Sequence, residues 1–119
     1  MSFKPSKSAI GQSRIIKAAM DNGISTMKAI TWAQIQQTYE KQYGEKLDTR
    51  AMKYYFNIPK ISQLLLGLMS PIFCIVNGFF SENPEEIVIR LRRPMVDLLA
   101  EFFTEVGVEV PPIPAGPSF

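Results

Sequence analysis

The spacing of apolar residues changes from a helical to an alternating pattern near residue 70, and this change restricts the fold more than any other feature of the 119-residue chain. Before that point apolar side chains recur every three or four positions, as on one face of an α-helix. Residues 72–76 are instead β-branched or aromatic apart from one cysteine, and residues 86–92 alternate polar with apolar side chains. Such runs are typical of strands. Helices followed by two strands predict a mixed α+β fold.

Capping residues and glycines indicate where the first two helices begin and end. We expect one helix from Ser6 or Ser8 to Asn22, because a serine can cap its start and Asn22 is followed by a glycine that can end it. A loop with a short extended piece follows over residues 23–30. The second helix is expected over residues 32–43, between a threonine cap and Gly44, which ends the helix.

Three further helical segments are expected. Asp48 or Thr49 is well placed to cap a helical turn that runs through Phe56. Pro59 is predicted to break this turn and to begin the next helix at its first position, since proline is tolerated there. By the same argument, the segment from Pro94 to about residue 106 is predicted to be a final helix.

The two strands are predicted to form a β-hairpin. Asn77-Gly78 and residues 81–84 are turn formers, which indicates an irregular tip. Three helices followed by a hairpin are the order of a winged helix-turn-helix, with the final helix as an addition. We therefore expect one mainly α domain with a small hairpin over residues 8–106, a flexible N-terminus over residues 1–7 and a Pro-rich tail over residues 107–119.

Composition restricts the chemistry. The chain has no histidine and one cysteine, Cys74, so His-based metal sites, thiolate clusters, Ser-His-Asp triads and Cys-His dyads cannot form within it. We expect Cys74 to be a small buried side chain in a reducing compartment. No signal peptide and no apolar stretch of about 20 residues is found, which predicts a protein outside the membrane, cytoplasmic or nuclear. The chain is expected to be no enzyme and to need no metal or cofactor.

Charge is distributed unevenly along the chain. Residues 1–60 contain ten basic and four acidic side chains, and residues 61–119 contain three basic and seven acidic ones. This asymmetry suits a partner that carries both signs, although the solvated faces of ordinary domains look similar. The helix of residues 59–69 has no Arg or Asn for base contacts, and residues 79–86 include three carboxylates. Sequence-specific binding of duplex DNA is therefore disfavoured.

RNA binding by the basic half is compatible with the sequence. The cations expected to contribute are Lys41, Lys53 and Lys60. The aromatic side chains of residues 54–56 can stack on bases, or they can belong to the core.

The last helix has too many apolar residues for one buried stripe, because they cover an arc of roughly 160°. The residues expected on the buried side are Met95, Leu98 and Phe102. The candidates for an exposed apolar patch are Val96, Leu99 and Phe103. In the alternative interpretation the whole arc is covered, by the Pro-rich tail or by a second copy in a homodimer.

The segment Tyr-Glu-Lys-Gln-Tyr-Gly-Glu-Lys-Leu-Asp at residues 39–48 is followed by Tyr54, Phe56, Ile61 and the leucines at residues 64–66. In this order the chain resembles the LOTUS domain, also called OST-HTH, over about residues 8–92. That family has an aromatic-led helix ending in Phe-Gly, then a leucine, a short turn and a Leu-Leu helix. The last helix resembles the one added in the extended LOTUS subtype of germline proteins.

The resemblance implies a non-catalytic adaptor that binds the C-terminal RecA-like domain of a Vasa-type DEAD-box RNA helicase. Such an adaptor would recruit the helicase to cytoplasmic, perinuclear germ granules or modulate its activity. The implied contact residues are Ala33, Gln34, Gln37, Arg92, Arg93, Val96, Leu99 and Phe103. The resemblance also leaves an alternative function, the binding of single-stranded or G-rich RNA.

Overall fold

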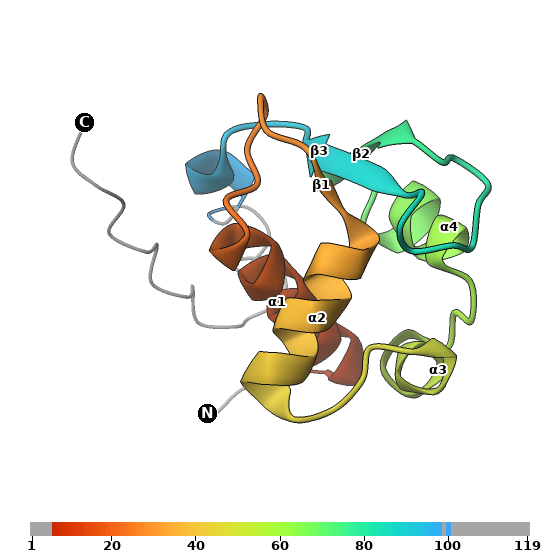
Figure 1. Cartoon of the computed structure of the whole chain (residues 1–119). Helices are drawn as coiled ribbons and strands as arrows, with labels where there is room; N and C mark the ends of the chain where they lie inside the picture. Colours follow the sequence, from red (N-terminus) through yellow and green to blue (C-terminus); the bar gives the residue numbers. More distant parts are fainter. Residues whose placement is uncertain (1–5, 99, 101–119) are drawn as a thin grey trace.

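The fold seen in the computed structural model, which describes residues 6–98 and 100, is of the α+β class (Figure 1). The elements in chain order are α1 (Lys7–Asp21), β1 (Ile30–Thr31), α2 (Trp32–Tyr43), α3 (Thr49–Phe56), α4 (Ile61–Gln63), the π-helical segment η1 (Leu64–Leu68), β2 (Phe73–Asn77) and β3 (Val88–Leu91). The expected class is confirmed. The winged helix-turn-helix with an added C-terminal helix is a finer assignment and stays a prediction.

Local capping residues fix α2 and α3 at the expected positions. The Thr31 side chain accepts a hydrogen bond from the Gln34 backbone, and the Gln34 side chain accepts one from the Thr31 backbone. Gly44 ends α2 in a left-handed conformation with φ of 70°. Asp48 caps α3 through the backbone N–H of Ala51, at 3.0 Å. Because these signals act within a few residues, the sequence predicts the bounds closely.

The prediction that Pro59 begins the next helix is wrong. α4 begins at Ile61, and Lys60 is its extended N-cap residue, without a side-chain cap. The acceptor comes instead from the loop between β2 and β3, where Glu82 accepts hydrogen bonds from the backbone N–H groups of Ile61 and Ser62 at 2.8 and 3.2 Å. This cap is tertiary, so local sequence cannot indicate it.

Two more helical details differ from expectation. The segment expected as a helical turn through Phe56 forms the eight-residue helix α3, a full helix in addition to the three expected before the hairpin. The helix that begins at α4 also widens into η1, where the Met69 N–H reaches back to the Leu64 carbonyl. Spacing of apolar residues does not distinguish a π-helical turn from an α-helical one.

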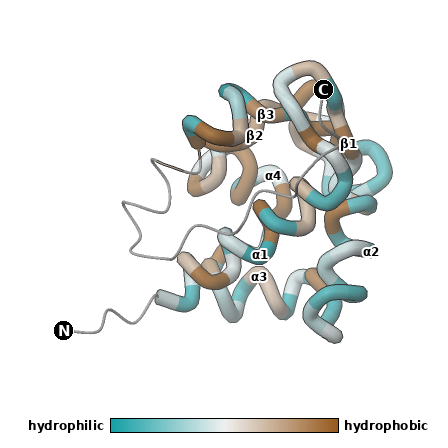
Figure 2. Tube along the Cα trace, turned by 90° about the vertical axis from the view of Figure 1, so that its left-hand side faces the viewer, coloured by the Kyte–Doolittle hydropathy of each residue, from teal (hydrophilic) through white to brown (hydrophobic). Residues whose placement is uncertain are grey.

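The sheet is antiparallel, with the strand order β1-β3-β2. The expected hairpin is confirmed, and the short extended piece before α2 adds a third strand through the pairing of Ile30 with Ile89. A bulge lies between Ile75 and Asn77, where Val76 has no partner in the register. Figure 2 shows a largely hydrophobic trace in the strands, and their inward side chains pack against the helices.

The chain after β3 turns toward the loop that precedes β1. The Leu91 N–H donates to the Ser25 carbonyl at 3.1 Å, and residues 95–98 form a helical turn in which the Leu98 N–H bonds the Pro94 carbonyl. Leu98 is 3% exposed, whereas Val96 is 60% exposed. Met95 packs against the core. Met95 and Leu98 therefore lie on the buried side of the apolar arc and Val96 lies on its exposed side, as expected.

Some predictions fall outside the described residues. These are the flexible N-terminus except residues 6 and 7, the last helix beyond residue 100, the Pro-rich tail, and the side chains of Leu99, Phe102 and Phe103. One other expectation needs correction within the described part. Cys74 is only partly buried, because it lies on the outer face of the sheet, between the inward-facing Phe73 and Ile75.

Candidate functional site

A hydrogen-bond network at the junction of α2 and α3 ties three helices together. One carboxylate oxygen of Glu45 accepts bonds from Tyr55 at 2.8 Å, Tyr39 at 3.0 Å and Arg14 at 3.2 Å. Arg14 lies on α1 and also stacks over the ring of Tyr43, with its guanidinium 4.6 Å from the ring centroid. The charge of Glu45 is thus matched by a guanidinium and two hydroxyl donors.

Burial disfavours the ionised form of the tyrosines in this network. It raises the pKa of Tyr39 far above the ordinary value of 10, and it also raises the pKa values of Tyr43 and Tyr55. A hydroxyl with a raised pKa remains a donor at neutral pH. We therefore interpret the network as a structural support that holds the loop between α2 and α3.

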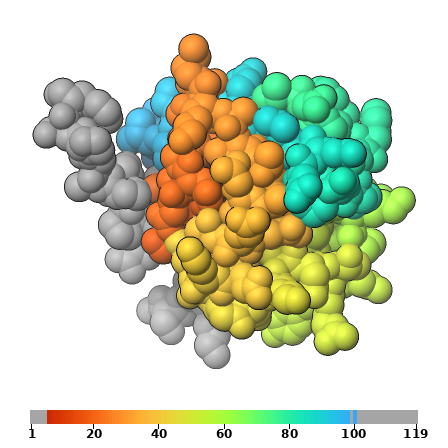
Figure 3. All heavy atoms as spheres, viewed as in Figure 1, coloured from red at the N-terminus to blue at the C-terminus, as the bar shows by residue number. Residues whose placement is uncertain are grey.

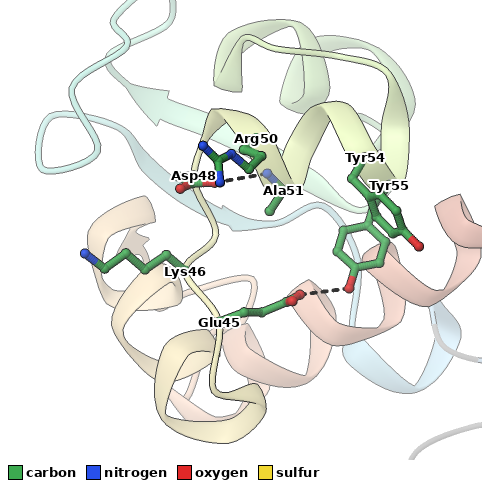
Figure 4. Close-up of a pocket in the computed structure, with 7 residues that line it drawn as sticks. All are labelled: Glu45, Lys46, Asp48, Arg50, Ala51, Tyr54 and Tyr55. Atoms are coloured by element: carbon green, nitrogen blue, oxygen red, sulfur yellow. Dashed lines mark hydrogen bonds between the residues drawn. The ribbon is translucent and has the colours of Figure 1, made fainter.

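An open pocket of about 540 Å³ lies beside this loop (Figure 4). Its lining residues are Glu45, Lys46, Asp48, Arg50, Ala51, Tyr54 and Tyr55. Both carboxylates are already used, Glu45 in the network and Asp48 as the cap of α3. Lys46 and Arg50 are exposed and have no ion-pair partner among the described residues. The pocket therefore presents two cations that form no ion pair among the described residues.

Tyr54 gives this pocket an aromatic side. The ring is 59% exposed, the Lys7 ammonium lies 4.3 Å from its centroid, and the Tyr55 ring meets it edge to face at 5.0 Å. From the sequence, the aromatic residues 54–56 could either stack on bases or belong to the core. In the structure Phe56 belongs to the core, Tyr54 lies at the surface and Tyr55 is half-buried. Cations beside an exposed ring suit a nucleobase with its phosphate.

The three lysines predicted to contact RNA are exposed, but none of them lines this pocket. They are Lys41, Lys53 and Lys60. Lys46 and Arg50 were not among the residues predicted to bind RNA. A usable signal was the spacing of Arg50 and Tyr54, which are four residues apart and so share one face of α3.

A second hollow, of about 340 Å³, separates the outward face of α2 from the hairpin loop. Its lining residues are Ala33, Gln36, Gln37, Glu40, Asn83, Pro84 and Glu85. The Ala33 N–H donates to the Pro84 carbonyl at 3.1 Å, which fixes the loop against the helix. The structure therefore brings Ala33 and Gln37 of the predicted contact residues together. Gln34 is also exposed, but its side chain is part of the capping box.

The other predicted contact residues whose side chains are described are separated from α2 by a loop. Arg92, Arg93 and Val96 are exposed at the end of β3 and in the turn after it, and the Arg92 side chain donates to the Ser70 carbonyl. Figure 3 shows the loop of residues 22–29, in orange, between this blue turn and α2. Met27 in that loop is 93% exposed. Met27 was not predicted as a contact residue, because no periodic pattern in the sequence indicates it.

The acidic hairpin loop is folded onto α4. Besides capping the helix, Glu82 accepts a bond from the Ser62 hydroxyl at 2.9 Å, and Glu86 accepts one from Ser81 at 2.7 Å. A carboxylate therefore occupies the N-terminus of the helix that would enter a DNA groove. This arrangement opposes phosphate binding there and agrees with the expectation that duplex DNA is disfavoured.

Comparison with known proteins places the chain in a family. The family model described as "Domain of unknown function (DUF7516)" matches residues 10–98. The chain belongs to the DUF7516 family. No curated protein and no solved structure matches it. The family match of this DUF7516 domain extends from α1 to the buried Leu98, so it includes the turn after β3.

The described residues include no helix with the length and apolar character of a membrane span. They also contain no group of three or more His, Cys, Asp or Glu side chains arranged to hold a metal ion.

Proposed function

We propose that this DUF7516 domain is a non-catalytic protein-interaction adaptor. The partner suggested by the resemblance to extended LOTUS domains is the C-terminal RecA-like domain of a Vasa-type DEAD-box RNA helicase. The adaptor would recruit that helicase to germ granules or shift the equilibrium between its conformations by differential affinity.

The observation that carries the proposal is the exposure of Met27 and Val96 near α2. Exposed apolar side chains mark a protein-binding surface when they lie together on one face of the molecule. A partner that contacts both α2 and the turn of residues 95–98 must also cover the loop between them, where Met27 lies (Figure 3). The hollow at Ala33 and Gln37 supplies a concave polar rim for the same surface.

We expect Met27→Asp and Val96→Asp each to weaken helicase binding at least tenfold, or by about 1.4 kcal/mol, since each would place a charge in a desolvated contact. Both side chains are exposed, so the fold should be unchanged. Calorimetric titration with the purified C-terminal RecA-like domain measures the effect. For the wild type we expect a micromolar Kd, or about −8 kcal/mol.

The matched control is Phe80→Asp, which removes another exposed apolar side chain, in the loop between β2 and β3. Its affinity should equal that of the wild type. Leu99→Glu and Phe103→Asp extend the test to the last helix, and Arg92→Glu and Arg93→Glu should mainly change the association rate and its salt dependence. Absence of wild-type binding at micromolar concentrations, or unchanged affinity in all these folded variants, would refute the adaptor proposal.

A second candidate function is RNA binding, and the pocket of Figure 4 favours it. Lys46 and Arg50 can contact phosphates while a base stacks on Tyr54. Electrostatic contacts of this kind release counterions, so affinity falls as salt rises. Stacking on an aromatic ring tolerates any base, which predicts a preference for single strands and weak sequence specificity.

If RNA binds here, Tyr54→Ala and Arg50→Ala should each weaken it about tenfold, since one stacked base is worth about 1–3 kcal/mol. Fluorescence anisotropy with labelled single-stranded and G-rich RNA at two salt concentrations measures this. Lys41→Ala and Lys60→Ala, outside the pocket, should have smaller effects than Lys46→Ala. Binding that ignores salt, or that survives the loss of Tyr54, would rule the pocket out.

A further inference from the structure

The sheet edge formed by β2 is flanked by a concentrated apolar surface. Eight large apolar side chains are exposed in the described part of the chain, and five of them lie in η1, in β2 or directly after β2. We define the apolar patch as Leu66, Leu68, Val76, Phe79 and Phe80. Phe80 is 86% exposed. The other three exposed side chains, Met27, Tyr54 and Val96, lie elsewhere in the fold.

The fold holds these side chains outward. The segment η1 packs beside β2 and connects to it through a short turn, so both contribute to the same side of the molecule. The bulge in β2 leaves Val76 exposed. Gly78, with φ of 77°, then starts the turn that presents Phe79 and Phe80. Figure 3 shows η1 and the hairpin, green to cyan, away from the blue turn after β3.

Opposite charges lie at the two ends of this patch. At one end lies Arg92, which is exposed and follows β3. Its backbone N–H donates to the carbonyl of Ile72, the residue before β2. The other end is the hairpin loop, which carries Glu82, Glu85 and Glu86. β2 itself has no charged residue. An apolar strand between a cationic and an anionic end is complementary to its own copy when the two strands run antiparallel.

We propose that the apolar patch binds the same patch of a second copy of this chain in a two-fold symmetric dimer. A two-fold axis near Ile75 places the Arg92 end of each copy beside the acidic hairpin loop of the other. The same rotation brings Phe79 and Phe80 of one copy toward Leu66 and Leu68 of the other, since the chain enters β2 from η1 and leaves it toward Phe79. Such an interface is isologous and therefore closes at two copies.

The dimer packs through side chains and does not continue the sheet. The bulge at Val76 interrupts the regular edge that a neighbouring strand would need. A membrane surface is a poorer occupant, because the carboxylates beside Phe80 would face anionic headgroups. The five residues of the apolar patch do not belong to the proposed helicase surface, whereas Arg92 and Glu85 belong to both surfaces. Phe80→Asp and Val76→Lys therefore distinguish the dimer from the proposed function.

Sedimentation equilibrium of the full chain, from about 5 to 200 µM, tests the proposal. The average mass should rise with concentration from 13.4 kDa toward twice that value. Phe80→Asp and Val76→Lys should raise the dimer Kd at least tenfold, because each places like charges or an unpaired charge in the contact. Met27→Asp, which removes an equally exposed side chain outside the patch, should leave the dimer Kd unchanged.

Charge exchange tests the antiparallel arrangement. Arg92→Glu and Glu85→Arg should each weaken the dimer, and the double variant should restore it toward the wild-type Kd. A constant mass of one chain at all concentrations would overturn the proposal and leave a different protein as the occupant of the patch. A dimer that Met27→Asp disrupts and Phe80→Asp does not, or a double variant weaker than both single ones, would overturn it as well.

Discussion

Gly78→Ala is expected to destabilise the folded domain by about 3 kcal/mol or more. The residue has a φ of 77°, a left-handed conformation that costs a residue with a Cβ about 1–2 kcal/mol. A Cβ there would also lie 2.5 Å from the backbone oxygen of Glu86. That backbone cannot move away freely, because the Glu86 N–H is bonded to the Asn83 carbonyl at 3.0 Å.

Gly44→Ala is the matched control, because Gly44 has a similar φ of 70° but nothing within 4 Å of the added Cβ. It should lower the free energy of unfolding only through the unfavourable left-handed conformation, by about 1 kcal/mol. Urea unfolding of the two variants and the wild type gives both free energies of unfolding. Equal losses at the two glycines would show that the close approach of the hairpin strands at Gly78 is not maintained in solution.

Removal of residues 94–119 is expected to lower the Tm by about 10 °C or more. The deletion exposes the surfaces against which Leu98 and Met95 pack. The burial of one such side chain contributes about 1.5–3 kcal/mol. A short helix is marginal alone, so its stability depends on this packing.

Two point variants locate the effect within the deleted segment. Leu98→Ala should cost about 2–4 kcal/mol, because it leaves a cavity in the core. Val96→Ala, two residues away and largely exposed, should change the free energy of unfolding by less than about 0.5 kcal/mol. Thermal unfolding followed by circular dichroism distinguishes them. Similar Tm values for all three proteins would mean that the turn does not dock on the domain.

The candidate site could be predicted only in part. Exposed positions on α2 follow from helical periodicity, which is why Gln34 and Gln37 are exposed as expected. The hollow beside Ala33 requires the hairpin loop, which approaches from residues 83–85, some 50 positions along the chain. Met27 belongs to a loop without a repeating pattern, so no local rule distinguishes it from its neighbours.

The sequence by itself determined the elements whose signals are local. Thr31 and Gly44 cap α2 with their own neighbours, and Asp48 caps α3. Each of these interactions joins residues close in the chain, so its free energy hardly depends on the rest of the fold. The inward position of Leu98 and the outward position of Val96 follow from helical spacing in the same way.

Only the tertiary structure decided the start of α4, the pocket at Tyr54 and the apolar patch. Glu82 caps α4 from about 20 residues away, and the network of Glu45 with Arg14 joins residues 31 positions apart. Which aromatic of residues 54–56 is buried depends on where α1 lies against α3. These features depend on contacts between residues that are distant in the chain. Such contacts form only when the whole domain packs.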